Sequence, residues 1–151
     1  MNKYDNKGQV FRSIRKIAEN HRPNIFAFKR APKDNCKWLQ IFLAGIAGPS
    51  ETPYEGGIFY ISISLLDTFY NYKFQFLTKI LHPNISDDGI IQIEMPSRYK
   101  QDIEDGLIWI IELLKKPKWE LATNQELVQI YNENEEKYFS YVEEATAMYA
   151  I

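Results

Sequence analysis

The chain has 151 residues, of which 45% are hydrophobic and 15% aromatic, and this suits one folded domain with its own core. Its formal net charge of −2 provides no basic face for nucleic acid, so we expect no nucleic-acid partner. No apolar run approaches the roughly 20 residues of a membrane span, and we expect no membrane partner. The polar start lacks the apolar stretch of a secretory signal, which predicts a cytoplasmic or nuclear protein.

Thiol and imidazole side chains are scarce. Cys36 is the only cysteine, so the chain can form neither an internal disulfide nor a thiolate metal cluster. His21 and His82 are the only imidazoles, and we therefore expect no metal site. Cys36 falls at the start of a predicted strand with no imidazole near it in the sequence. We interpret it as a small packing residue rather than as a nucleophile.

Periodicity predicts a single domain over residues 1–151, with residues 1–8 as a flexible N-terminus. In chain order, an amphipathic helix is predicted over 9–20 and strands over 24–30, 37–45, 58–65 and 72–78. In the third strand, Phe59, Ile61 and Ile63 alternate with polar or smaller residues, which indicates one buried face. Four strands in succession, separated by turn residues, favour an antiparallel meander.

After His82 the chain loses periodicity until about residue 102, and long irregular segments in small domains are often functional. A helix is then predicted from Ile103 to Lys116, with Asp102 as its N-cap. Thr123-x-x-Glu126 has the pattern of a capping box that opens a further helix. A last helix is predicted from about Glu135, with Tyr138, Val142, Ala145 and Tyr149 on its apolar face. Segregated strands and helices indicate an α+β fold.

Two motifs identify a family resemblance. Residues 45–59 read GIAGPSETPYEGGIF, and residues 76–85 read FLTKILHPNI. Both segments, in this order and at this separation, are similar to those of the ubiquitin-conjugating enzymes, whose fold is known as the UBC fold. The resemblance extends from about residue 9 to residue 150. It implies the UBC fold, thioester transfer of ubiquitin or a ubiquitin-like protein as the family activity, and no bound cofactor.

The sequence departs from the family pattern at the catalytic position. The family's catalytic cysteine lies eight residues after the asparagine of the His82-Pro83-Asn84 motif, and Gln92 stands there. A glutamine amide cannot form the thioester that a thiolate forms. Gln92 is either a natural placeholder in an inactive fold or an engineered replacement in an active enzyme. Changes elsewhere around the expected cleft favour the natural placeholder.

The resemblance also assigns roles to neighbouring residues. Asn84 stabilises the oxyanion in active relatives, but without a nucleophile we interpret His82, Pro83 and Asn84 as a bracing turn. Glu94 corresponds to an acidic residue near the active site, and here we expect a solvated or loop-bracing carboxylate. Tyr99 replaces a tryptophan in the following loop.

Residues that could bind a partner lie in two further places. The basic residues Arg12, Arg15 and Lys16 form a stripe on the first predicted helix, where relatives meet the activating enzyme and ligases; an ordinary solvated helix face is the alternative. Leu65 and Leu66 occupy the turn where relatives offer apolar residues to ligases.

Two functions follow as hypotheses. The first is a non-catalytic adaptor or regulator, similar to the cysteine-less conjugating-enzyme variants, that binds ubiquitin or a ubiquitin-like protein, an active conjugating enzyme or a ligase. The second is a genuine conjugating enzyme whose cysteine is substituted at Gln92. A scaffold that has lost contact with the pathway is a third, weaker possibility.

Overall fold

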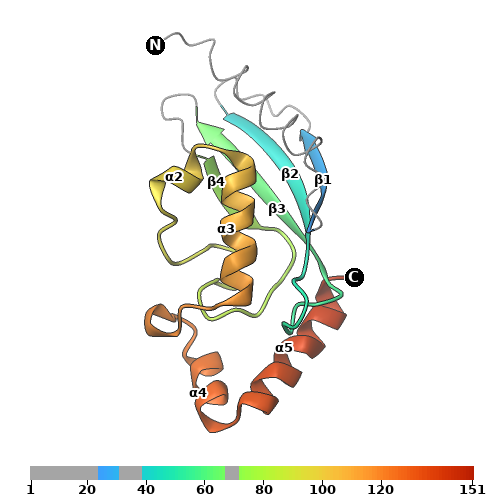
Figure 1. Cartoon of the computed structure of the whole chain (residues 1–151), viewed down its shortest axis with the longest axis vertical. Coiled ribbons are helices and arrows are strands. Elements are labelled where there is room, and N and C mark those ends of the chain that lie inside the picture. Colours follow the sequence, from blue (N-terminus) through green and yellow to red (C-terminus); the bar gives the residue numbers. More distant parts are fainter. Residues whose placement is uncertain (1–23, 31–38, 67–71) are drawn as a thin grey trace.

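The computed structural model describes residues 24–30, 39–66 and 72–151. Its elements are β1 (Ile25–Arg30), β2 (Leu39–Ala47), β3 (Ile58–Leu66), β4 (Tyr72–Phe76), α2 (Ser97–Lys100), α3 (Ile103–Lys115), the 3-10 turn η1 (Trp119–Leu121), α4 (Gln125–Glu133) and α5 (Glu135–Tyr149) (Figure 1). The strands form one antiparallel sheet in the order β1-β2-β3-β4. The predicted α+β fold, with a four-stranded meander followed by C-terminal helices, is confirmed. The helix predicted over residues 9–20 lies outside the described residues.

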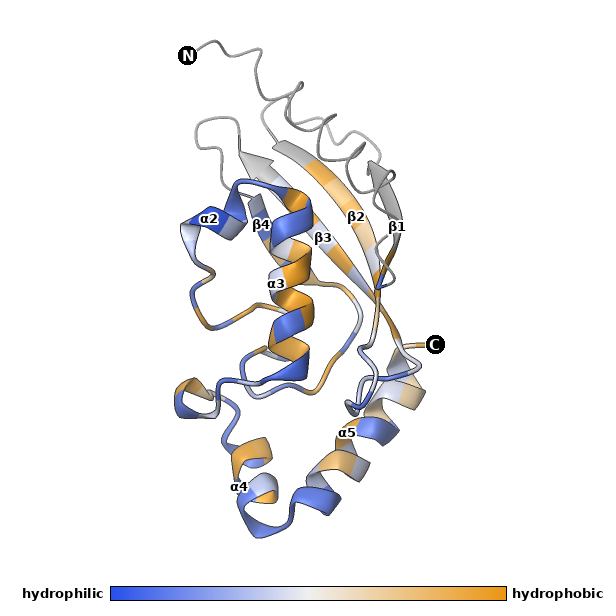
Figure 2. Cartoon of the chain, in the orientation of Figure 1, coloured by the Kyte–Doolittle hydropathy of each residue, from blue (hydrophilic) through white to orange (hydrophobic). Residues whose placement is uncertain are grey.

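One face of the sheet and one side of α3 form the core. Phe59, Ile61 and Ile63 of β3 are fully buried, as their alternation predicts, and Phe74 of β4 joins them. Figure 2 shows an apolar stripe along α3, which lies across the sheet. A Cβ atom on Gly106 of α3 would come within 2.2 Å of the Phe74 ring. The absence of a side chain at this position therefore lets the helix pack directly on β4.

The ladder between β2 and β3 corrects one prediction. The predicted strand ended at Leu65, and Leu65 and Leu66 were also assigned to a turn; both belong to β3, where Leu66 pairs with Leu39 and Leu65 pairs with Gln40. Leu65 also pairs with Tyr72 of β4. The antiparallel partners on either side continue the strand past the point where the local sequence pattern predicts its end.

Helix caps confirm one prediction and correct another. The Asp102 side chain accepts a hydrogen bond from the Glu104 N–H at 2.9 Å, so Asp102 is the predicted N-cap of α3. At α4 the N-cap is Asn124, whose Oδ1 accepts from the Leu127 N–H at 3.2 Å. The capping box predicted from Thr123 is therefore not formed, because the N-cap lies one residue later and Leu127 rather than Glu126 takes the N3 position. Thr and Asn are both good N-cap residues, and here the Thr123 hydroxyl instead bonds to Gln92.

The stripe along α5 also differs from the prediction. Tyr138, Val142, Thr146 and Ala150 are buried in steps of four residues, whereas Tyr149 is 44% exposed. The Ala150 carbonyl accepts a hydrogen bond from the Ile58 N–H at 2.9 Å, which fixes the end of the chain to the start of β3. This attachment rotates Thr146 and Ala150, rather than Ala145 and Tyr149, toward the rest of the protein. Figure 1 shows the C-terminus beside the connection between β2 and β3.

Three aromatic rings join η1, α4 and α5. Trp119 stacks on Tyr131 with ring centroids 4.0 Å apart, and Tyr138 meets Trp119 edge-on at 5.2 Å. Such pairs are worth about 1 kcal/mol each beyond their buried area. Trp119 thus packs between α4 and α5.

The segment predicted to be irregular, from His82 to about residue 102, is partly regular. It contains the short helix α2 and isolated β-bridges that pair Gln75 with Ile90 and Ile85 with Ile91. These bridges are too short to leave a periodic signal in the sequence. They nevertheless hold the segment against the edge of β4.

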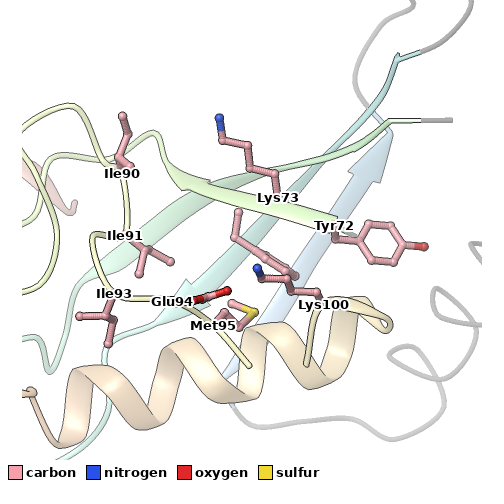
Figure 3. Close-up of a pocket in the computed structure, with 9 residues that line it drawn as sticks. Tyr72, Lys73, Ile90, Ile91, Ile93, Glu94, Met95 and Lys100 are labelled. Carbon is pink, nitrogen blue, oxygen red and sulfur yellow. The ribbon is translucent and has the colours of Figure 1, made fainter. Parts of the chain in front are cut away.

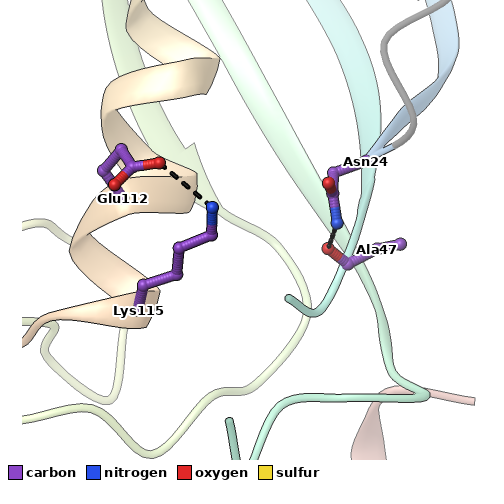
Figure 4. Close-up of polar contacts among 4 residues, drawn as sticks. All are labelled: Asn24, Ala47, Glu112 and Lys115. Atoms are coloured by element: carbon purple, nitrogen blue, oxygen red, sulfur yellow. Dashed lines mark hydrogen bonds and ion pairs between the residues drawn. The ribbon is translucent and has the colours of Figure 1, made fainter. Parts of the chain in front are cut away.

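Polar contacts secure the margins of the fold (Figure 4). Asn24 donates through Nδ2 to the Ala47 carbonyl at 3.3 Å, which closes the edge between β1 and β2. On α3, the Lys115 ammonium lies 3.1 Å from the Glu112 carboxylate, one turn away. Both side chains of this ion pair are exposed, and such pairs contribute at most about 1 kcal/mol.

Within the described residues, no helix is both long enough and apolar enough to cross a membrane. The same residues contain no group of three or more His, Cys, Asp or Glu side chains placed to hold a metal ion.

Candidate functional site

His82 organises the turn that follows β4. Its Nδ1 accepts a hydrogen bond from the Asn84 N–H at 3.0 Å, and its Nε2 lies 3.1 Å from the Leu113 carbonyl of α3. Because Nδ1 accepts, the ring must be the neutral tautomer that donates through Nε2. Burial lowers the pKa of His82 from 6.5 to about 4, although the Leu113 carbonyl opposes this shift. His82 therefore braces the turn as a neutral ring and is no proton shuttle near pH 7.

The ring of Tyr54 supports this turn from the other side. It stacks on His82 with ring centroids 5.9 Å apart and donates its hydroxyl proton to the Leu81 carbonyl at 2.7 Å. Burial raises the pKa of Tyr54 well above 10, with a smaller contribution from Tyr138. Tyr54 comes from the first of the two motifs that identify the family resemblance, and His82 comes from the second. The fold thus brings both motifs into contact.

Asn84 joins the turn to the segment that follows α3. Its Nδ2 donates to the Lys118 carbonyl and its Oδ1 accepts from the Lys118 N–H, both at 2.9 Å. Asn84 is fully buried, and these two bonds use both ends of its amide. The neighbouring Pro83 carbonyl accepts from the N–H groups of Thr123 and Asn124, at 3.0 and 3.3 Å. The turn therefore fixes the path of the chain from η1 into α4, which agrees with the bracing role expected for His82, Pro83 and Asn84.

Gln92 lies directly against this turn. Its N–H donates to the Asn84 carbonyl at 2.8 Å, and its exposed side chain accepts a hydrogen bond through Oε1 from the Thr123 hydroxyl. Sequence analysis did not predict the pairing with Thr123, because the two residues are 31 positions apart. The Gln92 side chain thus connects the segment beside the His82-Pro83-Asn84 turn to Thr123, just before α4.

A tight turn sets the position of Gln92. The Gly89 N–H donates to the Ser86 carbonyl at 2.9 Å, and the Gly89 carbonyl accepts from the Phe76 N–H of β4 at 2.9 Å. Gly89 has φ +82°, and a Cβ there would lie 1.9 Å from the Phe76 carbonyl oxygen. Only glycine fits this conformation and this spacing without rearrangement. Gly89 therefore fixes the chain to β4 three residues before Gln92.

A hollow of about 350 Å³ opens beside Gln92. It lies between the turn and the start of α4, and Thr123, Leu127 and Tyr141 belong to its lining. Asp87 and Glu126 contribute carboxylates to it. The described residues that line it include no thiol, so none of them can form the thioester of the family reaction.

The other predicted site residues are not gathered here. Glu94 is exposed and lines a different hollow, beside β4. Tyr99 lies in α2, where its hydroxyl accepts from the Arg98 guanidinium at 2.9 Å. Leu65 and Leu66 lie in β3. The predicted basic stripe of Arg12, Arg15 and Lys16 lies outside the described residues, as does Cys36.

The structure combines a meander of strands, a helix across the sheet and a hydrogen-bonded His-Pro-Asn turn. The resemblance predicts this combination for a UBC fold. Comparisons with known proteins agree. A family model described as "Ubiquitin-conjugating enzyme" matches residues 10–146. The chain is 32% identical over 133 residues to "Probable ubiquitin-conjugating enzyme E2 31" of Arabidopsis thaliana, an alignment that covers 84% of this chain and 83% of that protein.

A solved structure gives the same result. The E2 domain of a Toxoplasma gondii ubiquitin conjugating enzyme matches with a TM-score of 0.77 and 25% identity, over 94% of this chain and 99% of that domain. The chain belongs to the ubiquitin-conjugating enzyme family.

Proposed function

We propose that this chain is a non-catalytic member of its family. It acts in the cytoplasm or nucleus as an adaptor or regulator of ubiquitin or ubiquitin-like conjugation, by binding the modifier, an active conjugating enzyme or a ligase. The observation that carries this proposal is the position of Gln92 and the hydrogen bond of its side chain. By resemblance it occupies the catalytic position eight residues after Asn84, and its side chain is bonded to Thr123 across the site.

The chemistry of the family supports this reading. Transfer of a modifier requires a thiolate that attacks one thioester and forms the next. The Gln92 amide nitrogen is not nucleophilic near pH 7, and its carbonyl oxygen is bonded to a hydroxyl. The one cysteine, Cys36, lies outside the described residues. By its place in the sequence we interpret it as a packing residue, and Cys36→Ser in the assay below tests this interpretation.

One observation favours an alternative function, that of a genuine conjugating enzyme substituted at Gln92. The turn of His82, Pro83 and Asn84 is completely built, and the backbone of Gln92 is bonded directly to it. A thiol at position 92 would thus lie beside Asn84. In that case only the nucleophile is missing from the site.

A charging assay separates the two functions. The protein is incubated with activating enzyme, ATP and ubiquitin, and a thioester is sought on a non-reducing gel. Three chains are compared, namely the unchanged chain, Cys36→Ser, and Gln92→Cys in the Cys36→Ser background. We expect no thiol-sensitive band from any of them. A band from the unchanged chain that Cys36→Ser removes would refute the adaptor function, and a band only from Gln92→Cys would establish the alternative.

Binding is tested separately by NMR titration of the labelled chain with ubiquitin and with a panel of active conjugating enzymes. The adaptor function requires shifts at a contiguous surface with at least one of these partners. The absence of shifts with every partner would contradict it and favour a scaffold without contact to the pathway.

A further inference from the structure

Helix α5 has two rows of apolar or aromatic side chains, and only one of them packs against the fold. The buried row steps by four residues from Tyr138 to Ala150. Beside it, such residues recur at i, i+4, i+7 and i+8, a spacing that places them along one face of a helix. We call these residues the outer stripe: Tyr141, Ala145, Met148 and Tyr149. Tyr141 is 38% exposed and Met148 is 64% exposed, so the outer stripe faces solvent.

The exposed apolar surface of the protein is concentrated on this helix. Of the nine large hydrophobic side chains that are exposed in the described part of the chain, five lie between Phe139 and Ile151. Single exposed apolar residues are ordinary, but a contiguous group of them marks an interaction surface. Tyrosine and methionine are also enriched at the centres of protein interfaces. The outer stripe therefore has the composition of a docking surface.

The chain that follows β4 forms a wall beside the outer stripe. The Lys79 ammonium lies 4.7 Å from the centre of the Tyr149 ring. Two residues further on, the half-buried Leu81 lines the hollow beside Gln92 together with Tyr141. The chain from Lys79 to Leu81 therefore lies beside the outer stripe at both of its ends. An exposed helical stripe with such a wall suits a docked helix, which can contact both at once.

The Tyr141 end of the outer stripe is acidic. Asp87 and Glu126 contribute carboxylates to the hollow that Tyr141 lines. The exposed Glu144, about one helical turn after Tyr141, adds a third carboxylate, whereas the exposed Lys137, about one turn before Tyr141, adds one ammonium. Carboxylates therefore outnumber ammonium groups at this end.

The wider surface has the same sign. Residues 125–151, which include α4 and α5, contain six glutamates and one lysine, whereas the whole chain has a formal net charge of −2. The Tyr149 end of the outer stripe is the exception, since Lys79 lies over the Tyr149 ring. A partner that complements both ends needs basic groups near Tyr141 and an acidic group near Lys79.

A helix meets this requirement when it lies antiparallel to α5. Acidic residues are favoured in the first turn of a helix, and basic residues are favoured in its last turn. Antiparallel docking places the first turn of the partner helix beside Tyr149 and its last turn beside Tyr141. The charges that stabilise the partner helix are then also the charges that complement the outer stripe.

A second copy of α5 does not meet this requirement. Two copies that paired through the outer stripe in a closed dimer would be related by a two-fold axis near Ala145, the middle of the stripe. Glu144 of one copy would then lie beside Glu144 of the other, and like charges at an interface are unfavourable. In addition, α5 has no basic residue in its last turn, so a second copy would bring no cation from that turn to the acidic end.

We propose that the outer stripe of α5 binds an amphipathic helix of a partner protein, with acidic residues in the first turn of that helix and arginine or lysine in its last turn. The apolar side of the partner helix packs on Ala145 and Met148. Its basic residues pair with Glu144 and with the carboxylates near Tyr141, and its acidic residues pair with Lys79. The outer stripe spans only about two helical turns, so the contact is small and the binding is weak and reversible.

Helix binding at the outer stripe goes beyond the proposed function and does not depend on it. The charging assay detects a thiol at position 92, which is not part of the outer stripe. An adaptor can also bind its partners at other surfaces. Failure of helix binding would therefore leave the proposed function standing, and a positive charging assay would leave helix binding unaffected.

The test uses the full chain, labelled with ¹⁵N, and an acetylated and amidated peptide of about 16 residues, a length at which alanine-based helices form in isolation. The peptide has leucines at i, i+4, i+7 and i+8 among alanines, glutamates in its first turn and arginines in its last turn. We expect it to shift the amide resonances of Ala145 and Met148. The amides of Met95 and Lys100 should not move, since these residues line the separate hollow beside β4 (Figure 3).

Two control peptides have the same composition. One exchanges the glutamates and the arginines, and the other redistributes the leucines around the helix. Equal binding by the first would overturn the charge assignment, and equal binding by the second would overturn the apolar contact. If the amides of Ala145 and Met148 do not move with excess peptide, the site is wrongly assigned.

Two matched pairs of variants, all at exposed positions of α5, sharpen the test. Met148→Gln should weaken peptide binding about fivefold by removing an apolar contact, whereas Phe139→Gln, which the helical spacing places off the outer stripe, should change little. Glu144→Lys should weaken binding about fivefold, because an attractive contact becomes a repulsive one. Glu143→Lys, on the side of the helix opposite to the outer stripe, is its control and should also change little. Equal effects within either pair would contradict the proposed site.

Sedimentation equilibrium of the chain without peptide tests the other occupant. We expect Met148→Gln to leave the molar mass in solution unchanged. A dimer that this variant dissociates would identify a second copy of the chain as the occupant and would overturn the proposal.

Discussion

The buried neutral ring of His82 predicts a loss of stability in mild acid. Its pKa of about 4 in the folded protein lies below the ordinary value of 6.5. Between these pH values the unfolded chain therefore binds more protons than the folded chain. The resulting contribution to stability is fully present above pH 6.5 and is lost as the pH falls toward 4.

The size of the effect follows from the two pKa values. A separation of about 2.5 units corresponds to about 3 kcal/mol in total, and about 2 kcal/mol of this is lost between pH 7 and pH 5. Ordinary carboxylates titrate mainly below this interval, since their pKa values lie near 4. The free energy of unfolding in urea, measured at pH 7 and at pH 5, should therefore fall by about 2 kcal/mol.

The chain provides its own control, because His21 is the only other imidazole. His21→Gln should retain the fall in stability between pH 7 and pH 5, and His82→Gln should lose most of it. NMR of His21→Gln makes the test independent of how well His82→Gln folds, because one imidazole remains to be observed. If that ring titrates near pH 6.5 in the folded protein, the reasoning from its burial is wrong.

Three further predictions concern turns and caps. Gly89→Ala should destabilise the fold by about 3 kcal/mol in urea unfolding, whereas Gly56→Ala, with nearly the same φ but open space around it, should cost about 1 kcal/mol; equal losses would contradict the role of the close contact. Asn84→Ala should cost about 2 kcal/mol, because it removes both hydrogen bonds between the buried amide and the Lys118 backbone, and a loss below 1 kcal/mol would show that water replaces the amide. Asn134→Ala removes the N-cap of α5. It should lower the free energy of unfolding by about 1 kcal/mol and the thermal unfolding midpoint accordingly. Asn132→Ala, at an exposed position of α4, is its control and should leave the midpoint unchanged or slightly raised, because alanine has the higher helix propensity.

Local patterns in the sequence were enough to predict the four strands and the three longer C-terminal helices, but not α2 or η1. The alternation of Phe59, Ile61 and Ile63 identified the buried face of β3, and Asp102 marked the start of α3 correctly. Strand ends were less predictable, because pairing partners rather than local residues extend β3 to Leu66. The choice of Asn124 over Thr123 as a cap depends on a distant hydrogen bond that no local pattern contains.

The candidate site was predictable in its residues but not in its contacts. The family resemblance placed His82, Asn84 and Gln92 together, and the structure does the same. Their partners are the backbone of Lys118, 34 residues from Asn84, and the hydroxyl of Thr123. A backbone partner leaves no trace in residue type, so it could not be read from the sequence. The hollow beside β4 was missed because its lining comes from β4, from the segment 90–95 and from α2.

The double hydrogen bond between Asn84 and Lys118 also has a consequence for folding kinetics. It closes a loop of 34 residues that contains all of α3, so it can form only after that helix has docked on the sheet. We expect the Lys118 amide to exchange its proton with solvent on the timescale of α3 undocking rather than of local fraying. Hydrogen exchange at this single amide would then report on the moment at which the sheet and the C-terminal helices become one cooperative unit.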